Sequence, residues 1–284
     1  MGNENDSITF TALDTNLRWQ RIWIKNEASP CSLKYCQITY ANNSAIYNEA
    51  NLYLSNCFLN KNFTDFFGGG IFNRGILEMA NNIIIKNLAA GGGGLANIGR
   101  AIICNNWLLE NFASFGGSIA NFGIITINNN QIINNFAYNG GSIYNRGDAI
   151  LNNNTIIDSS LSTIFIINPK ITINNNNLNN LNSNGYTIYN NSSDTINARN
   201  NYWYTLDSII IEQKIYDFYD DFTKGIVYYQ PFLREPIGIK EIKEKKINKL
   251  KGIYDIQGRK IRKLKKGIYF LKDKNRLKKI IFLK

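Results

Sequence analysis

The chain has 284 residues, no histidine, four cysteines and a formal net charge of +11. The charge is uneven, since residues 238–284 contain 18 Lys and Arg against 4 Asp and Glu, whereas residues 1–237 contain 14 against 17. The basic excess therefore belongs to the tail, and we expect no nucleic-acid partner for the main body.

The cysteines and the apolar residues exclude two further classes. Without histidine or any CxxC spacing, the four cysteines predict no zinc site, and no other metal or cofactor is indicated. We expect unpaired buried thiols, with a Cys31–Cys36 disulfide as the alternative. No run of 18 apolar residues occurs, so no membrane span is predicted.

A repeat of 24 residues dominates the middle of the chain. Four segments carry its strongest copies: GGGIFNRG at 68–75, GGGLANIG at 92–99, GGSIANFG at 116–123 and GGSIYNRG at 140–147. Weaker copies lie at 44–50, 162–168 and 186–190. A fixed period of this length is typical of a solenoid, a propeller or an array.

The pattern inside each copy selects among these architectures. Apolar residues alternate over four or five positions, Asn or Gly pairs interrupt them, and no helical spacing appears, so the segments are predicted to be short strands. A propeller blade needs about 40 residues. Roughly three strands and three turns in each copy therefore predict an all-β protein, a single-stranded parallel β-helix of seven to nine coils.

Equivalent residues of successive coils would stack about 4.8 Å apart. One such column is a predicted inward ladder of amides: Asn48, Asn73, Asn97, Asn121, Asn145 and Asn190. A second amide column runs through Asn87, Asn111 and Asn135. Two apolar columns are predicted to fill the core, Ile71/Leu95/Ile119/Ile143 and Ile85/Leu109/Ile133/Ile157. Stacked amides can hydrogen-bond one another and cap buried turn backbone.

The glycine pairs have the same period. Gly69, Gly93, Gly117 and Gly141 form one column, which we interpret as corners that need positive φ and close stacking. A phosphate loop would need one cluster before a helix, and no helix follows any copy. In the first copy Phe72 and Arg74 should point outward, where a partner would contact them.

The GG[GS]I[YF]N repeats resemble those of right-handed parallel β-helix, pectin-lyase-like surface proteins, including the chlamydial polymorphic outer membrane proteins. Residues 8–48 are similar to the entry coils of such proteins, and NNYWYTLDSIIIEQKIYDFYDDFTKGIVYYQPFL at 200–233 is similar to their closing segment. The resemblance implies a β-helix domain over 1–235. It also implies that Asp217, Asp220 and Asp221 form a capping turn, with a calcium loop as the alternative.

The tail carries a second resemblance. GIYDIQGRKIRKLKKGIYFLK at 252–272 resembles the C-terminal sorting domain of type IX secretion cargo. The matching residues are Tyr254, Gln257, Gly258, Arg259, Gly267, Ile268 and Tyr269. The resemblance implies a small antiparallel β module over 236–284 that contacts the secretion machinery and leaves the protein secreted or attached to the outer-membrane surface.

Such cargo needs an N-terminal export signal, and MGNENDSITF has neither a basic nor an apolar region of that kind. The expectation is a fragment or a wrong start. A β-helix by itself does not define function. Our leading hypothesis is a non-catalytic, secreted or surface-displayed protein that contacts cell-surface glycans or host surfaces, and we expect a monomer. The alternative is a polysaccharide lyase or glycoside hydrolase.

One column bears on catalysis. Lys86, Glu110, Asn134 and Asp158 share it and are expected to face solvent. Glu110 and Asp158, two coils apart, would then lie roughly 9–10 Å from each other, close to the carboxylate separation of inverting glycosidases. A solvated ladder with a Lys86–Glu110 pair is the alternative. Four aromatic residues could stack on sugar rings or shield coil edges: Phe72, Tyr144, Trp107 and Tyr202.

Overall fold

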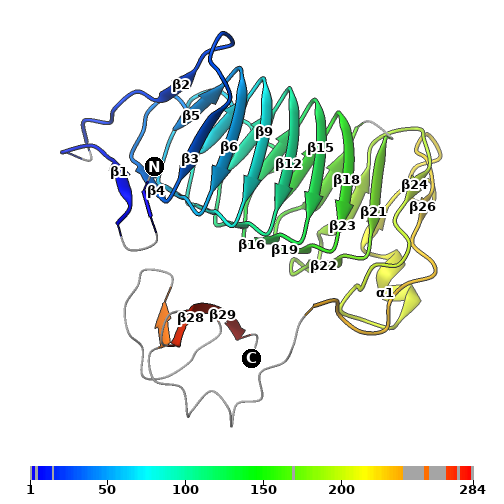
Figure 1. Cartoon of the computed structure of the whole chain (residues 1–284). Coiled ribbons are helices and arrows are strands. Elements are labelled where there is room, and N and C mark those ends of the chain that lie inside the picture. The colour runs from blue at the N-terminus through cyan, green and yellow to red at the C-terminus, as the bar shows by residue number, and fades with distance from the viewer. Residues whose placement is uncertain are drawn as a thin grey trace. The chain divides into compact units, whose positions relative to one another are not determined.

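The computed structural model describes residues 2–3, 6–14, 16–167 and 170–238, and the backbone of 253–255, 267–273 and 276–282. The chain divides into two compact units, Met1–Ile237 and Gly238–Lys284. The first unit is a parallel β-solenoid, which confirms the predicted β-helix (Figure 1). Within the described residues it has one helix, α1 (Ser208–Glu212), which is too short to cross a membrane.

Three parallel sheets form the walls of the solenoid, and a regular coil gives one strand to each. The first sheet contains β1 (Ile8–Phe10), β4 (Cys36–Thr39), β7 (Phe58–Asn60), β10 (Ile83–Ile85), β13 (Trp107–Leu109), β16 (Gln131–Ile133), β19 (Thr155–Asp158) and β22 (Asn177–Asn180). The second contains β2 (Ile22–Ile24), β5 (Ile46–Asn48), β8 (Ile71–Asn73), β11 (Leu95–Asn97), β14 (Ile119–Asn121), β17 (Ile143–Asn145), β20 (Ser162–Ile166), β23 (Tyr186–Asn190) and β25 (Ile215–Tyr216).

The third sheet contains β3 (Cys31–Lys34), β6 (Asn51–Ser55), β9 (Ile76–Ala80), β12 (Arg100–Cys104), β15 (Ile124–Asn128), β18 (Asp148–Asn152), β21 (Ile171–Asn174), β24 (Ile196–Asn197) and β26 (Val227–Tyr228). The register confirms the 24-residue step, since Leu95 pairs with both Ile71 and Ile119. Every coil therefore places the same motif position above the same position of the next coil.

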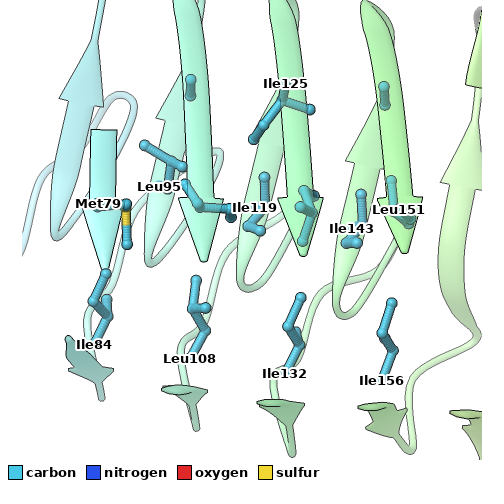
Figure 2. Close-up of a cluster of buried hydrophobic side chains, with 14 of the residues drawn as sticks. Met79, Ile84, Leu95, Leu108, Ile119, Ile125, Ile132, Ile143, Leu151 and Ile156 are labelled. Carbon is cyan, nitrogen blue, oxygen red and sulfur yellow. The ribbon is translucent and has the colours of Figure 1, made fainter. Parts of the chain in front are cut away.

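The core is a stack of aliphatic layers between the three sheets (Figure 2). The predicted column from Ile71 to Ile143 is fully buried there. The second predicted column is wrong by one residue. The first sheet contributes Ile84, Leu108, Ile132 and Ile156 to the core cluster. Ile85, Leu109, Ile133 and Ile157 are buried outside that cluster. Two or three consecutive apolar residues in these strands leave alternation unable to choose the inward one.

The corners depend on residues in the left-handed conformation. At one corner an Asn with φ near +55° precedes an inward Asn, as in the pairs Asn81–Asn82 and Asn105–Asn106. At the glycine corner the positive φ belongs to Gly68, Gly92, Gly116 and Gly140. This corrects the assignment of positive φ to the column that begins with Gly69. The Gly69 column instead permits the predicted close stacking of coils, because a Cβ on Gly69 would lie 2.6 Å from the Leu88 carbonyl oxygen.

The predicted amide ladder is confirmed over five coils. The Nδ2 atoms of Asn48, Asn73, Asn97 and Asn121 each donate to Oδ1 of the next member, at 2.7–2.9 Å. Each also donates to backbone carbonyls, as Asn121 does to Gly123 and Asp148. The ladder ends at Asn145, because Ile166 occupies the following position and separates it from Asn190. Asn190 donates instead to the carbonyls of Asp194 and Gly225.

Two further amide columns line the solenoid. The second predicted column extends by one coil toward the N-terminus to Asn62, whose Nδ2 donates to Asn87 Oδ1 at 2.9 Å. The third was not predicted: Asn82, Asn106, Asn130, Asn154, Asn176 and Asn201. Cys57 and Cys36 continue this column, since the Cys57 amide donates to Asn82 and the Cys36 amide donates to Cys57 Sγ. All four cysteines are free, so the Cys31–Cys36 alternative is wrong, and the expected burial is confirmed only for Cys36 and Cys57, since Cys31 and Cys104 are half-buried.

The second unit contains three antiparallel strands among its described residues, β27 (Ile253–Asp255), β28 (Gly267–Asp273) and β29 (Arg276–Phe282). Tyr254 lies in β27 and pairs with Phe270 of β28. Gly267, Ile268 and Tyr269 open β28, whereas Gln257, Gly258 and Arg259 lie outside the described residues.

Candidate functional site

The predicted carboxylate pair is not brought together on one surface. Glu110 has a φ of +50° at a corner, is exposed, and forms the predicted ion pair with Lys86 at 3.5 Å. Asp158 is fully buried, so the expectation that it faces solvent is wrong. One carboxylate in water and one inside the solenoid do not flank a common groove, and the geometry needed for two-carboxylate hydrolysis is missing from this pair.

A shortened coil buries Asp158. Ile143 pairs with Ile164, a step of 21 residues in place of 24. Glu110 and Asn134 turn outward in the left-handed conformation, but Asp158 ends strand β19, and strand alternation points its side chain inward after Ile157. Its carboxylate accepts hydrogen bonds from Ser142 Oγ at 2.8 Å and Thr163 Oγ1 at 2.9 Å. Burial raises the pKa of Asp158 to about 7, despite these hydrogen bonds.

Aromatic side chains form a row along the outer face of the second sheet. Nine register-matched positions define this aromatic row: Trp23, Tyr47, Phe72, Ala96, Ala120, Tyr144, Phe165, Tyr189 and Tyr216. In its C-terminal coils the rings stack, with centroids 4.9 Å apart for Phe165 and Tyr189 and 4.1 Å apart for Tyr189 and Tyr216. In its N-terminal coils the Tyr47 ring contacts the rings of Trp23 and Phe72 edge to face.

Three phenylalanines bridge the two alanine coils of the row. Phe67, Phe115 and Phe122 pack against one another, and Phe115 lies 4.9 Å from Tyr144. A Cβ on Gly91 would overlap the Phe115 ring, so this glycine gives Phe67 and Phe115 the space to meet. Aromatic contacts therefore continue from Trp23 to Tyr216 without a break. The two alanines of the row are fully buried, its other aromatic members are half-buried like Tyr144, and Trp23 is 55% exposed.

The four aromatic residues considered from the sequence have different positions. Phe72 and Tyr144 belong to the aromatic row and are half-buried. Trp107 is only 7% exposed, so the interpretation of an exposed ring is wrong for it. Tyr202 is half-buried beside Tyr204 near the closing end. Arg74 points outward as predicted, and its Nη1 donates to the Tyr47 hydroxyl at 3.3 Å.

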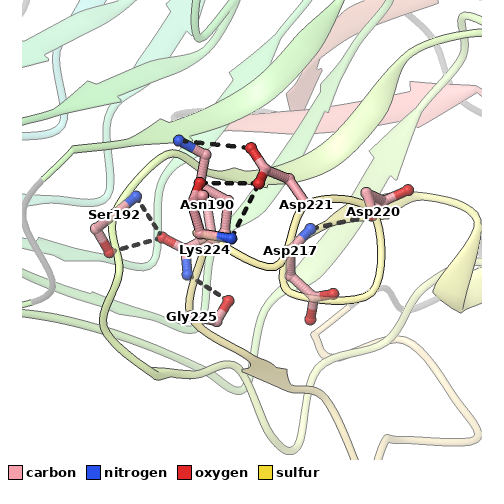
Figure 3. Close-up of polar contacts among 8 residues, drawn as sticks. Asn190, Ser192, Asp217, Asp220, Asp221, Lys224 and Gly225 are labelled. Carbon is pink, nitrogen blue, oxygen red and sulfur yellow. Dashed lines mark hydrogen bonds and ion pairs between the residues drawn. The ribbon is translucent and has the colours of Figure 1, made fainter.

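The acidic closing segment caps its own backbone (Figure 3). Asp217 accepts from the amides of Tyr219 and Val227, and Asp220 accepts from the Asp217 amide. Asp221 accepts from Thr223 and lies 3.9 Å from Lys224 Nζ. The predicted capping turn is therefore present. Within the described part of the chain, no group of three or more acidic or cysteine side chains is placed to hold a metal ion.

Two pockets lie at the closing end of the solenoid. The larger, of about 250 Å³, has three carboxylates in its wall, from Glu212, Asp217 and Asp220. The smaller, of about 150 Å³, lies between strand β23 and helix α1 and includes Trp203 and Lys214.

Comparisons with known proteins found no match to this chain. No protein-family model matches the chain, and no curated protein and no solved structure matches it.

Proposed function

We propose that the protein is a non-catalytic, surface-displayed β-helix whose aromatic row mediates adhesion to glycans. The row carries this proposal together with the three phenylalanines that bridge its alanine coils, because their aromatic contacts continue along nine coils. Aromatic side chains that keep one edge in water combine apolar contact area with polar tips. The row supplies both, since Tyr47, Tyr144, Tyr189 and Tyr216 add phenolic hydroxyls to its rings.

The repeat spacing suits an extended ligand. Neighbouring row positions are about 4.8 Å apart, so an elongated polysaccharide would meet several rings at once, each contributing a weak contact. Adhesion through many weak contacts needs no deep pocket, and such summed binding is far stronger than any one contact. The alternative, a carbohydrate-active enzyme, loses its best carboxylate pair because Asp158 is buried.

For export, the proposal assigns the tail the role of a type IX sorting module that delivers the protein to the outer surface or the medium. The antiparallel pairing of β27 with β28, which brings Tyr254 and Tyr269 into neighbouring strands, supports it. In a host with a type IX system, and with an export signal supplied, deletion of 238–284 should leave the protein in the periplasm. Normal release of the truncated protein would refute this role.

The adhesion role is tested by binding of the purified full chain to a panel of insoluble acidic and neutral polysaccharides. Tyr144→Ser with Tyr189→Ser interrupts the aromatic row, whereas Ile102→Ser with Ile150→Ser removes exposed residues from the third sheet, at 42% and 52% exposure. The first variant should lose binding and the second should retain it, and the wild type should release no sugar. Equal binding by both variants would contradict the proposal.

A further inference from the structure

Cys36 and Cys57 lie in neighbouring coils, at equivalent positions of the third amide column. Strand β4 pairs with β7 from Gln37 and Phe58 onward, and the same register carried back by one residue places Cys36 opposite Cys57. The Cys36 amide donates to Cys57 Sγ at 3.4 Å, and the two thiols are hydrogen-bonded to each other. The two sulfur atoms therefore face each other across one coil step.

The spacing of this pair suits a covalent bond between the sulfur atoms. Equivalent residues of stacked strands lie about 4.8 Å apart, and the Cα atoms of disulfide-bonded cysteines are usually about 4.4–6.8 Å apart. Strand stacking thus brings the two residues within disulfide range without any movement of the backbone.

Loss of the thiol protons leaves the nearest carbonyls paired. Cys36 Sγ lies 3.5 Å from the Lys34 carbonyl oxygen, and Cys57 Sγ lies 3.2 Å from that of Ser55. A thiol is only a weak donor. Both carbonyls also have a backbone donor, since Lys34 accepts from the Gly2 amide. Ser55 likewise accepts from the Tyr35 amide. Oxidation of the two thiols leaves neither of these oxygens without a partner.

The other two cysteines have no cysteine opposite them. Cys104 pairs in register with Ala80 on one side and Asn128 on the other. Cys31 pairs with Leu52. The register of the solenoid therefore selects one pair among the four cysteines, and it is a different pair from Cys31–Cys36.

We propose that Cys36 and Cys57 form a disulfide under oxidising conditions. Strands β4, β5 and β6 lie between them, so the bond closes one complete coil into a covalent ring (Figure 1). The oxidant is a low-molecular-weight disulfide: one cysteine thiolate attacks it and releases the first thiol, and the other cysteine then displaces the second. The two cysteines together lose two protons and two electrons, and the small disulfide leaves as two thiols.

Burial determines when the bond forms. Cys36 and Cys57 are 3% and 2% exposed, and burial raises the pKa of Cys57 to about 12 and also raises that of Cys36. Because the thiolate is the reactive form, the packed pair reacts slowly. We therefore expect the bond to form during folding, before this coil is packed, and then to be shielded from reductants. Disulfides persist outside the cytosol, as at the surface location proposed above.

The ring has a mechanical consequence for the N-terminal coils. Strands β1, β2 and β3 each pair on one side only and form the end of the three sheets. Unwinding that begins at this end would stop at the closed coil, since the chain between the two cysteines could no longer extend. The cross-link is separate from the aromatic row, and its test does not depend on glycan adhesion.

The test is refolding of the reduced, unfolded full chain with oxidised and reduced glutathione and a metal chelator, followed by alkylation and peptide mass mapping without reductant. A single cross-linked peptide should appear, Cys36–Cys57, with Cys31 and Cys104 outside any protein disulfide. The bond closes a loop across 21 sequence positions. The oxidised protein should therefore melt roughly 5 °C above the reduced one.

Two variants separate the cross-link from folding. Cys31→Ser combined with Cys104→Ser should form the same cross-link and show the same rise in melting temperature. Cys57→Asn should fold, because asparagine occupies the equivalent position of the next coil, Asn82. Its melting temperature should be the same with and without oxidant.

Three results would overturn the proposal. The first is a refolded wild type without the Cys36–Cys57 peptide. The second is equal amounts of cross-links to Cys31 or Cys104, which would mean that the register does not select the pair. The third is an oxidised protein that melts no higher than the reduced one, which would mean that the bond does not fit the folded coil.

Discussion

The wild type should lose stability as the pH rises from about 4 to 7, and replacement of Asp158 by asparagine should abolish this loss. Burial raises the pKa of this carboxyl from 3.8 to about 7 in the folded protein. Between these values the folded state holds a proton that the unfolded chain has released, so the free energy of unfolding falls as pH rises. At 1.36 kcal/mol for each pH unit, the full change is about 4 kcal/mol.

The asparagine side chain should fit this site. Asp158 is surrounded by the hydroxyls of Ser142 and Thr163 and the amide of Ser160. A hydroxyl can reverse and accept from the new amide group, so little stability is lost where Asp158 is protonated. The variant should therefore resemble the wild type near pH 4 and exceed it by up to about 4 kcal/mol near pH 8.

The assay is guanidinium unfolding followed by circular dichroism at a series of pH values, for wild type, Asp158→Asn and Glu110→Gln. Glu110 is exposed and its ion pair with Lys86 is worth less than about 1 kcal/mol, so Glu110→Gln should keep the wild-type slope. The reasoning is refuted if the wild-type and Asp158→Asn curves run parallel from pH 4 to pH 8, or if Glu110→Gln removes the slope as well.

Three further predictions test the fold. Asn121→Leu removes the hydrogen-bond acceptor of Asn97 and should lower the free energy of unfolding by about 1–3 kcal/mol. The control Asn134→Asp, at an exposed position, should change it by less than about 0.5 kcal/mol, and equal melting temperatures of the two variants would count against the ladder. Gly116→Ala should destabilise the protein more than Gly238→Ala. Both glycines have positive φ, but only a Cβ at position 116 would overlap a carbonyl group, that of Ile119. Equal unfolding midpoints of the two variants would contradict this steric argument. Iodoacetamide should modify the half-buried Cys31 and Cys104 before Cys36 and Cys57, because the latter two side chains are buried. Peptide mass mapping reports the order, and early labelling of Cys57 would contradict its buried position.

The amino-acid sequence was sufficient for the repeat architecture. A 24-residue step places identical residues above one another only if strands stack in parallel register, so Asn73 above Asn97 and Ile71 above Leu95 follow from the spacing. The same spacing predicted the Lys86–Glu110 pair. The sequence could not decide whether Ile84 or Ile85 faces the core, because Ile83–Ile85 is uniformly apolar and shows no alternation of apolar and polar residues.

The asparagine pairs of the sequence mark the amide column that the repeat motif did not predict. In Asn81–Asn82 the first residue takes positive φ and the second turns inward, and the same pair recurs at each later member of the third amide column as far as Asn200–Asn201. Cys57 and Cys36 were harder to place, since a thiol in an amide column becomes recognisable only once Asn56 and Tyr35 before them are seen to have positive φ.

The sequence by itself therefore determined the period, the parallel stacking and most ladder members, because these depend on residues that recur at one spacing. The tertiary structure alone decided what happens where the spacing breaks. The 21-residue coil removes the outward corner residue and turns Asp158 into the solenoid. The aromatic row and the pocket around Trp203 also required it, since side chains from different motif positions, such as Phe67 and Tyr144, meet on one surface only after the coils have stacked.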